Sequence, residues 1–486
     1  MFIKNFINKF DNKYLLCFSL FLIIIEFLLI LFSIQNYPGN KLIYIFFSFL
    51  ILIYLIFSLL KSNSFFHIFL SIFVFLGFFW KLSLNLIFNI NNGVFINVSR
   101  VFLTSVNCVD NKCENLSKLL FNPTLYDNTL IVSLVGIFGF FFSSLFYKVM
   151  KKKISVSTNL IPNFLYKNYL SLILSFGIIS VLLISYINYE YLIFQKGLVS
   201  ETNIPYLNNF FAWTLLYGIP TSITFYLHLE HKKNTEKIFL ALNFSHVIHF
   251  LVNISLLSRG MIFNTVSNIF GYIQHNNKTK FIKLFISCMF LLTLFVSSIH
   301  FVSLKRADFY SNTKDSLNVI TSENFNESNK TILNLFLNRW VGIEEVMLVE
   351  NYENKNFDFF IKSLNERQSD QKIPLFDSEI FKDYQYIDRT KFNFVSIPGL
   401  IAFTHFSNNY LLIFFICFFF SLFFSIIEIL ALKISINNLF YSSLIGQLLA
   451  YRIIHFGVYP IETYKFLISI LLCFITYYIM NKIFLK

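Results

Sequence analysis

Apolar runs separated by short polar stretches fill most of this chain. A helix needs about 20 apolar residues to cross the ~30 Å hydrocarbon core of a bilayer, and most of the runs reach that length. The pattern predicts an all-α fold, a polytopic transmembrane helix bundle of about 12 spans. The predicted spans cover residues 14–34, 41–60, 65–88, 129–147, 168–187, 207–227, 238–257, 260–274, 281–301, 409–432, 437–456 and 464–481.

Two stretches fit this pattern less well. The run at 260–274 is short for a span. The segment 393–408, NFVSIPGLIAFTHFSN, contains Pro398-Gly399, which would break a helix. We expect a broken or interfacial piece there, leading into the tenth span.

Lysine and arginine set the expected orientation, because they are enriched in the cytoplasmic loops of membrane proteins. With the N-terminus inside, the cytoplasmic segments hold 17 Lys and Arg residues, including KVMKKK at 148–153. The five short outside segments hold only five. Both chain ends are therefore expected in the cytoplasm.

The outstanding polar segment, residues 302–396, is acidic, with 15 acidic against 12 basic residues. We divide the chain into spans 1–9 (1–301), a large periplasmic loop (302–396) and spans 10–12 (397–486). Within the loop, Leu and Val recur at helical spacing in TILNLFLNRWVGIEEVMLVENY. This spacing predicts short helices lying against the membrane.

Composition supports a membrane protein. Only 13% of the residues are charged, against about 25% in a soluble domain. Basic residues that flank spans explain the net charge of +13, so no nucleic-acid partner is expected. The first apolar run is longer than a signal-peptide core and lacks a small-residue cleavage site, so no cleavable signal peptide is expected.

Cys108 and Cys113, in CVDNKC, fall in an outer loop, where a small disulfide is expected.

Ionisable side chains inside spans are functional candidates, because charge is costly in hydrocarbon. Glu26 and Glu428 fall in spans one and ten, where a neutral form or pairing with another helix is the simpler explanation. Lys81 in span three is followed by Asn85 and Asn89 at steps of four, which makes one polar face. Lys81 is therefore a candidate substrate-binding residue, with snorkelling to the surface as the alternative.

Span seven carries a polar face formed by Asn243, His246, His249 and Asn253. Two histidines without a third ligand are too few for a metal site, so hydrogen bonding between helices is the expected role. The face ends at Arg259, at the expected outer surface. Arg259 is a candidate for function.

Span eleven and the residues after it read LLAYRIIHFGVYPIETY and place Arg452, His455 and Glu462 in or beside an apolar helix. Tyr451, His455 and Tyr459 recur at steps of four, on a face that also includes Gln447 and rises toward the outer surface. Interfacial anchoring is the alternative to a functional role. We expect these side chains and Arg259 to converge, with the acidic loop, on one outer-facing site.

Absent motifs narrow the chemistry. The sequence has no Gly-rich phosphate loop, no HExxH and no paired acidic metal motif, so no metal or cofactor is expected. The first outer loop, SIQNYPGN, has no acidic residue, unlike lipid-phosphosugar glycosyltransferases that hold a catalytic carboxylate there. Cationic side chains with one histidine suit a negatively charged substrate, and the planar fork of arginine binds two phosphate oxygens at once.

Four stretches carry a resemblance to a family: SLLSRGMIF, NRWVGIEEVMLVE, SIPGLIAFTHFS and AYRIIHFGVYPIETY. With them, the chain resembles bacterial O-antigen or capsular oligosaccharide repeat-unit polymerases of the Wzy type. The layout of twelve spans with a large outer loop between spans nine and ten also matches. The resemblance covers mainly residues 245–300 and 330–465.

The resemblance implies a metal-independent glycosyltransferase of the bacterial inner membrane. It would move the growing glycan from undecaprenyl pyrophosphate to a hydroxyl of the incoming lipid-linked repeat unit at the periplasmic face. Arginines would hold the pyrophosphate, and His455 would take the proton from the attacking hydroxyl. A chain-length regulator protein is a further candidate partner. The expected set is catalytic His455, Arg452 and Arg259, and substrate-binding Arg339, Lys81, Tyr451, Tyr459 and Glu462.

Two other functions stay open. An O-antigen ligase has a similar layout and also uses outer Arg and His. A lipid-linked oligosaccharide flippase should have short loops and charges in a central cavity, and the long outer loop argues against it. Some polymerases show paired Arg-and-Gly patterns in two outer loops. The loop 188–206 has Lys196 and no Arg, which argues against capture by two such loops here.

Overall fold

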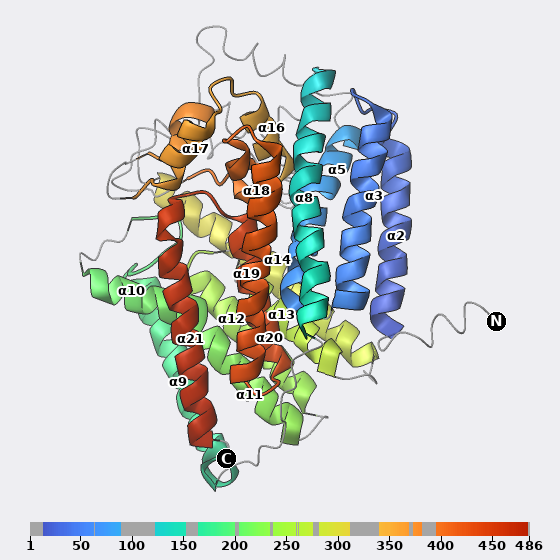
Figure 1. Ribbon diagram of the computed structural model, residues 1–486. Helices are drawn as coiled ribbons and strands as arrows, with labels where there is room; N and C mark the ends of the chain where they lie inside the picture. Colours follow the sequence, from blue (N-terminus) through green and yellow to red (C-terminus); the bar gives the residue numbers. More distant parts are fainter. Residues whose placement is uncertain are drawn as a thin grey trace, which may run out of the picture.

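The described part of the chain is a helical bundle without strands, seen here in a computed structural model (Figure 1). The structure describes residues 13–62, 64–88, 122–151, 164–199, 204–233, 237–258, 260, 262–275, 281–311, 340–368, 373–381 and 395–484. The helices, with π and 3-10 turns written η, are α2 (Lys13–Ser33), α3 (Lys41–Phe57), η1 (Ser58–Ser62), α4 (Phe65–Val74), η2 (Phe75–Trp80), α5 (Lys81–Phe88), α8 (Pro123–Lys151), α9 (Phe164–Glu190), α10 (Pro205–Trp213), η3 (Thr214–Gly218), α11 (Ile219–Lys233), α12 (Ile238–Ser255), α13 (Ile262–His275), α14 (Phe281–Ser311), α16 (Ile343–Glu350), α17 (Phe357–Leu364), η4 (Phe376–Phe381), α18 (Gly399–His405), α19 (Tyr410–Ile434), α20 (Leu439–Ile454), η6 (Pro460–Glu462) and α21 (Thr463–Phe484).

Each of the twelve predicted apolar runs is helical, and eight helical segments in the described residues are long and apolar enough to cross a membrane. The remaining runs correspond to α2 and α9, which have 21 and 27 residues, and to α13 and α20, which have 14 and 16 and are short for a span. The 14 residues of α13 span about 21 Å, less than a ~30 Å hydrocarbon core. The eight candidate spans are Lys41–Ser62, Phe65–Ile87, Pro123–Met150, Tyr206–Lys232, Ile238–Ser255, Ile282–Val302, Tyr410–Ile434 and Pro460–Phe484.

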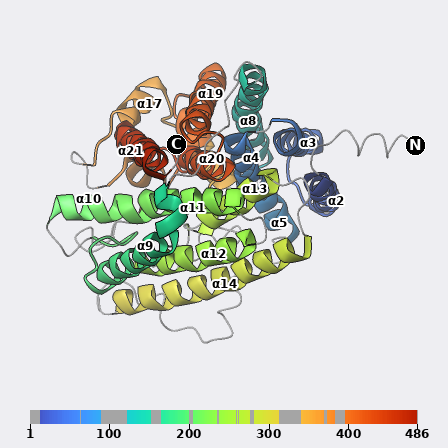
Figure 2. The ribbon, with the colours of Figure 1, turned by 90° about the horizontal axis from the view of Figure 1, so that it is seen from below.

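The helices form two groups, which separate clearly in the view from below (Figure 2). One group contains α9 to α12 and α14, and the other contains α2, α3, α8, α19 and α21, each with its own cluster of buried apolar side chains. The groups meet where α13 packs on α20. A Cβ atom on Gly271 would lie 2.8 Å from Phe440 Cα, and Ser443 Oγ donates to the Ser267 carbonyl oxygen at 2.7 Å. We call this contact the α13–α20 seam.

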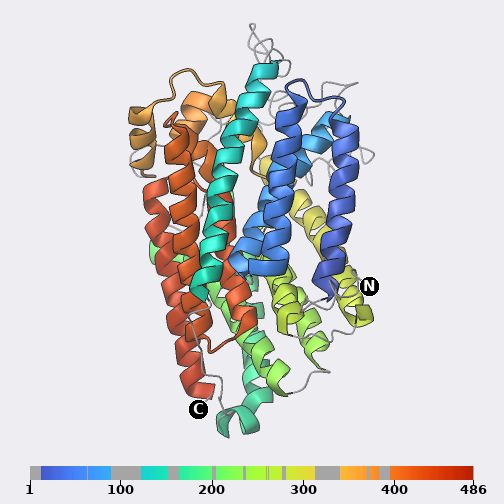
Figure 3. The same ribbon diagram turned by 45° about the vertical axis from the view of Figure 1, so that its right-hand side comes forward.

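One side of the bundle presents α21, α19, α8, α3 and α2 next to one another, coloured from red through teal to blue (Figure 3). These helices expose large apolar side chains, among them Phe27, Phe46, Phe146, Phe419 and Leu471. An apolar face of this extent is unfavourable in water and favourable against lipid. This exposed apolar face therefore supports the assignment of the chain as a membrane protein.

The loop helices lie at one end of the bundle, with α16, α17 and α18 at the top of Figure 1 and the end of α21 at the bottom. The predicted short helices of the loop are confirmed in α16, which begins after Gly342. The Glu345 carboxylate accepts a hydrogen bond from the Gly342 N–H at 2.7 Å and so satisfies one exposed donor of the helix start. α14 continues to Ser311, past the predicted start of the loop at residue 302.

The segment 393–408 is interrupted, as its sequence predicts. Pro398 directly precedes the short helix α18, and Gly399 has a φ of +77°, which favours glycine. The Gly399 N–H donates to the Phe456 carbonyl oxygen at 2.9 Å, which ties α18 to the residues that follow α20. Asn409 then caps α19 by accepting hydrogen bonds from two backbone N–H groups.

Candidate functional site

The C-terminal end of α20 carries the predicted site residues Tyr451, Arg452 and His455. The helix ends just before His455, which is its C-cap residue. Tyr459 lies beyond the helix with a φ of +47°. The prediction that Tyr459 continues the helical face of Tyr451 and His455 is therefore wrong. The chain leaves the helix because Gly457, with a φ of +109°, turns it away.

Four aromatic rings meet beside this helix end, and we call them the aromatic cluster: Phe73, Phe263, Trp340 and Tyr451. The ring centroids of Phe73 and Phe263 are 5.6 Å apart, those of Phe263 and Trp340 5.7 Å, and those of Phe73 and Tyr451 6.2 Å. The His455 ring stacks on Tyr451 at 3.9 Å. The cluster therefore provides a packed platform that holds the imidazole of His455 in place.

Arg259 and Arg339 lie outside the described residues, but each has a described neighbour at the aromatic cluster. A Cβ atom on Gly260 would lie 3.6 Å from Tyr451 Oη. Trp340 is itself a member of the cluster. The stretches that contain the three predicted arginines therefore approach one another, as expected, while the positions of the Arg259 and Arg339 side chains stay predictions.

The Arg452 guanidinium is directed toward α21. Its Nη2 donates to Thr463 Oγ1 at 3.0 Å, and its Cζ lies 5.9 Å from the ring centroid of Phe466. Its Nε is buried and has no hydrogen-bond partner in the described part of the chain. Arg452 and His455 thus contact different neighbours. A half-buried guanidinium with an N–H that lacks a partner in the described residues is well suited to binding an anion.

Lys81 is paired within the chain. Its ammonium, 1% exposed, lies 2.6 Å from Glu344 Oε2 and donates to the Trp340 carbonyl oxygen at 3.0 Å. Asn85 Nδ2, one turn further on, lies 3.5 Å from Glu344 Oε1. These contacts make Lys81 an anchor for the start of α16. The substrate-binding role predicted for Lys81 would require this pair to open.

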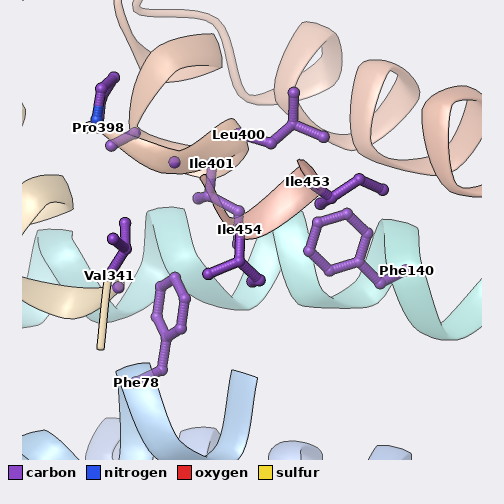
Figure 4. A pocket seen from close by; sticks show the side chains of 11 residues that line it. Phe78, Phe140, Val341, Pro398, Leu400, Ile401, Ile453 and Ile454 are labelled. Atoms are coloured by element: carbon purple, nitrogen blue, oxygen red, sulfur yellow. The ribbon is translucent and has the colours of Figure 1, made fainter. Parts of the chain in front are cut away.

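The chain before α16 also approaches η2 so closely that a Cβ atom on Gly77 would collide with the Val341 carbonyl oxygen. The neighbouring gap between these segments, α8, α18 and α20 has a volume of about 10 Å³ and is lined by apolar side chains such as Phe78 and Ile454 (Figure 4). An apolar gap of this size has room for about one water molecule. It is a packing gap and not a ligand site.

Glu462 lines a surface groove of about 560 Å³. Its Oε2 lies 2.7 Å from Lys465 Nζ, and its Oε1 accepts from the Gln368 N–H at 3.2 Å. Thr463, the hydrogen-bond partner of Arg452, lies in the sequence between two of the residues that line the groove but does not line it itself. The lining residues are Arg367, Gln368, Ile461, Glu462, Tyr464 and Lys465.

An ionic cluster around Glu350 was not predicted from the sequence. The Glu350 carboxylate lies 2.6 Å from His405 Nε2 and 3.1 Å from Lys355 Nζ, and it accepts from Asn128 Nδ2 at 3.1 Å. Burial alone would raise the pKa of Glu350, but the hydrogen bonds from His405 and Lys355 outweigh it and hold the pKa at about 2. The cluster fastens α16 to α8 and α18. In the sequence, the sign of this cluster was His405, a polar residue within the apolar stretch of α18.

Glu428 in α19 has a structural partner on another helix. Ser64 Oγ donates to its Oε2 at 2.6 Å, and the N–H groups of Phe65 and Phe66 donate to its two oxygens at 2.8 and 3.1 Å. These are the first free N–H groups of α4, so Glu428 caps that helix from a distant part of the chain.

The polar face of α12 bonds to α14, which confirms the prediction for span seven. His246 Nε2 lies 3.1 Å from Ser287 Oγ, and Asn253 Nδ2 donates to Ser298 Oγ at 3.3 Å. His249 Nδ1 lies 2.7 Å from a backbone carbonyl oxygen of its own helix. These contacts account for the polar face through packing between helices.

The α13–α20 seam contains buried amides, of which the sequence pattern indicated only Gln447. Asn264 and Asn268 on α13 and Gln447 on α20 are nearly inaccessible, and each has at least one side-chain polar atom without a partner in the described residues. Unpaired amide groups are costly in an apolar bundle. The seam is therefore polar just below the aromatic cluster.

Other predicted features fall outside what the structure describes. Cys108 and Cys113 lie in a segment that is not described, so their disulfide stays a prediction. Within the described ranges, no group of three or more His, Cys, Asp or Glu side chains is placed to hold a metal ion.

Comparison with known proteins gives no match: the sequence matches no family model, no curated protein and no solved structure. The function must therefore be argued from the residues and the geometry of the site.

Proposed function

We propose that this protein polymerises lipid-linked oligosaccharide repeat units at the periplasmic face of the bacterial inner membrane. In this proposal it is a metal-independent glycosyltransferase that takes the growing glycan from undecaprenyl pyrophosphate. The loop 302–396 lies in the periplasm and both termini lie in the cytoplasm. The acceptor is a hydroxyl group of the incoming repeat unit.

The observation that carries the proposal is the packing of the four stretches on which the resemblance to such polymerases rests. Phe263 contacts Trp340, and Tyr451 joins them in the aromatic cluster. Gly399 binds the Phe456 carbonyl oxygen. Segments far apart in the chain thus meet at one place, beside the half-buried Arg452 and His455. The four stretches are residues 255–263, 338–350, 396–407 and 450–464.

The proposed step divides the work between histidine and arginine. His455 Nδ1 lies 3.1 Å from the Tyr451 carbonyl oxygen, so a proton on Nδ1 makes that contact a hydrogen bond and leaves Nε2 as the basic nitrogen. Nε2 takes the proton of the attacking hydroxyl group of the incoming repeat unit. The oxygen of that hydroxyl group bonds to the anomeric carbon of the growing glycan. The bond from that carbon to the pyrophosphate oxygen breaks, and Arg452, with Arg259 and Arg339, offsets the charge on the leaving group.

The Arg452 role predicts a specific substitution pattern. Arg452→Lys keeps the positive charge but loses the two-point fork, so it should impair polymer formation nearly as much as Arg452→Ala. The measurement is a gel of surface polysaccharide length from a deletion strain complemented with each variant. Lys362→Ala, an exposed cation of the loop, serves as the control and should give the wild-type ladder. A wild-type ladder from Arg452→Ala would remove this residue from the site.

The deletion strain also separates the polymerase from the ligase and the flippase. Loss of a polymerase leaves single repeat units attached to the lipid A core, whereas loss of a ligase leaves none. Loss of a flippase leaves lipid-linked units on the cytoplasmic side. Single attached units are the result that the proposal requires.

A further inference from the structure

Glu26 is a fully buried carboxyl group in α2. Its exposed fraction is 0%, and neither carboxyl oxygen has a hydrogen-bond partner in the described residues. The surrounding residues of α2 are apolar, and its outward face exposes side chains such as Phe27 and Leu31. An ionised carboxylate in such a place, without a counter-charge, costs far more than a neutral carboxylic acid.

Among the described residues, the elements packed against α2 supply no cation to Glu26. The tyrosines among their titratable groups are neutral at physiological pH. Lys41 and Lys61 are exposed, and the Lys81 ammonium is held by Glu344. The titratable and charged side chains on α3, η1 and α5 are Lys41, Tyr44, Tyr54, Lys61 and Lys81.

Glu428 is a matched contrast in the same chain. It is buried as deeply as Glu26, at 1% exposed, but three donors hold its oxygens. Those donors, at the positive end of α4, favour the ionised form. The two glutamates are therefore equally buried, but only Glu428 has hydrogen-bond donors that would stabilise a negative charge.

Two separate hydrogen-bonded groups of hydroxyls lie between the Glu26 side of α2 and the bundle end that carries α16. Ser33 lies two helical turns beyond Glu26, and its Oγ is 2.6 Å from Tyr44 Oη. The Tyr44 ring stacks on Tyr37 at 5.0 Å, and Tyr37 Oη donates to the Asp127 carboxylate at 2.9 Å. Asp127 lies near the start of α8, at that end of the bundle.

We propose that Glu26 is a proton-binding site inside the membrane: a carboxylic acid that keeps its proton at neutral pH because no group in the described residues around it offers a hydrogen bond or a positive charge. The inference does not depend on the polymerase proposal, because it rests only on the surroundings of α2.

The test uses dicyclohexylcarbodiimide, a lipid-soluble reagent that adds to protonated carboxyl groups. The full-length protein in lipid nanodiscs is treated at neutral pH, and labelled peptides are quantified by mass spectrometry. An ordinary Glu with a pKa near 4.3 is protonated in only about one molecule in 500 at pH 7. We therefore expect Glu26 to react on the order of 100-fold faster than Glu428. A water-soluble carbodiimide should label neither.

Infrared spectroscopy supplies a second measurement that needs no reagent. The wild-type protein should show the C=O stretch of protonated carboxylic acids at neutral pH, with Glu366 also contributing, and Glu26→Gln should lose the part of that band that Glu366→Gln leaves in place. If Glu26→Gln does not fold, the labelling of the wild-type protein decides alone. Equal labelling of Glu26 and Glu428, or no labelling of Glu26, would overturn the proposal.

Discussion

At the scale of single residues, the surroundings of a carboxyl group decide its charge. The Glu366 side chain is buried between α17 and η4, where burial raises its pKa to about 7. The Leu375 N–H, which donates to its Oε1 at 2.8 Å, opposes this rise, the nearby Asp377 adds to it, and Lys362 opposes it. The folded protein therefore binds this proton more tightly than the unfolded chain does.

This shift predicts how the stability of the loop depends on pH. Because the pKa of Glu366 is raised from 4.5 to about 7 in the folded state, its favourable contribution is complete below pH 4.5 and is lost as pH rises through about 7. Hydrogen exchange of residues 357–381, corrected for its intrinsic pH dependence, should become less protected over that rise. Glu366→Gln should flatten the dependence, and the exposed Glu353→Gln should not. An unchanged slope in Glu366→Gln would contradict the assignment.

At the scale of elements, hydrophobic runs were enough to place the helices, because a helix in lipid must satisfy its backbone within one segment. The ends of helices were not predictable in the same way. α20 stops where Gly457 packs against Pro398, from a different part of the chain. The convergence at the aromatic cluster was expected in outline, but the direction of Arg452 toward Thr463 depends on how α21 packs.

The anchoring of α16 by Lys81 gives a prediction at this scale. Breaking a buried ion pair from one side typically costs about 3–5 kcal/mol, because the partner charge stays unpaired. Lys81→Met should therefore lower the thermal stability of the purified protein strongly. The double variant Lys81→Met with Glu344→Leu should recover most of the loss, because both charges are removed together.

The same pair separates anchoring from substrate binding. If Lys81 only anchors the loop, the stable double variant should regain polymer formation. A double variant that is stable but makes no polymer would return Lys81 to the substrate site. Lys355→Met, which removes one of the cations around Glu350, is a control for general effects of losing a loop charge.

At the scale of the whole molecule, the two groups of helices meet at the α13–α20 seam, and the aromatic cluster lies beside it. The packed helices position the four converging stretches, while the loop helices close the end of the bundle above them (Figure 1). In the proposed orientation, with Lys and Arg enriched on the opposite side, this end would face periplasmic substrates. The seam and the ionic cluster at Glu350 escaped the sequence analysis because their partners lie far apart in the chain.

The most direct test of the account is an in vitro reaction with the purified protein in nanodiscs and an undecaprenyl-pyrophosphate-linked repeat unit as the only substrate. Wild-type protein should lengthen the glycan and release undecaprenyl pyrophosphate. His455→Ala and His455→Gln should fold normally and slow the reaction roughly 10²–10⁴-fold, because neither side chain can take the proton. Wild-type protein that makes no polymer, or His455→Ala that makes it at the wild-type rate, would contradict the account.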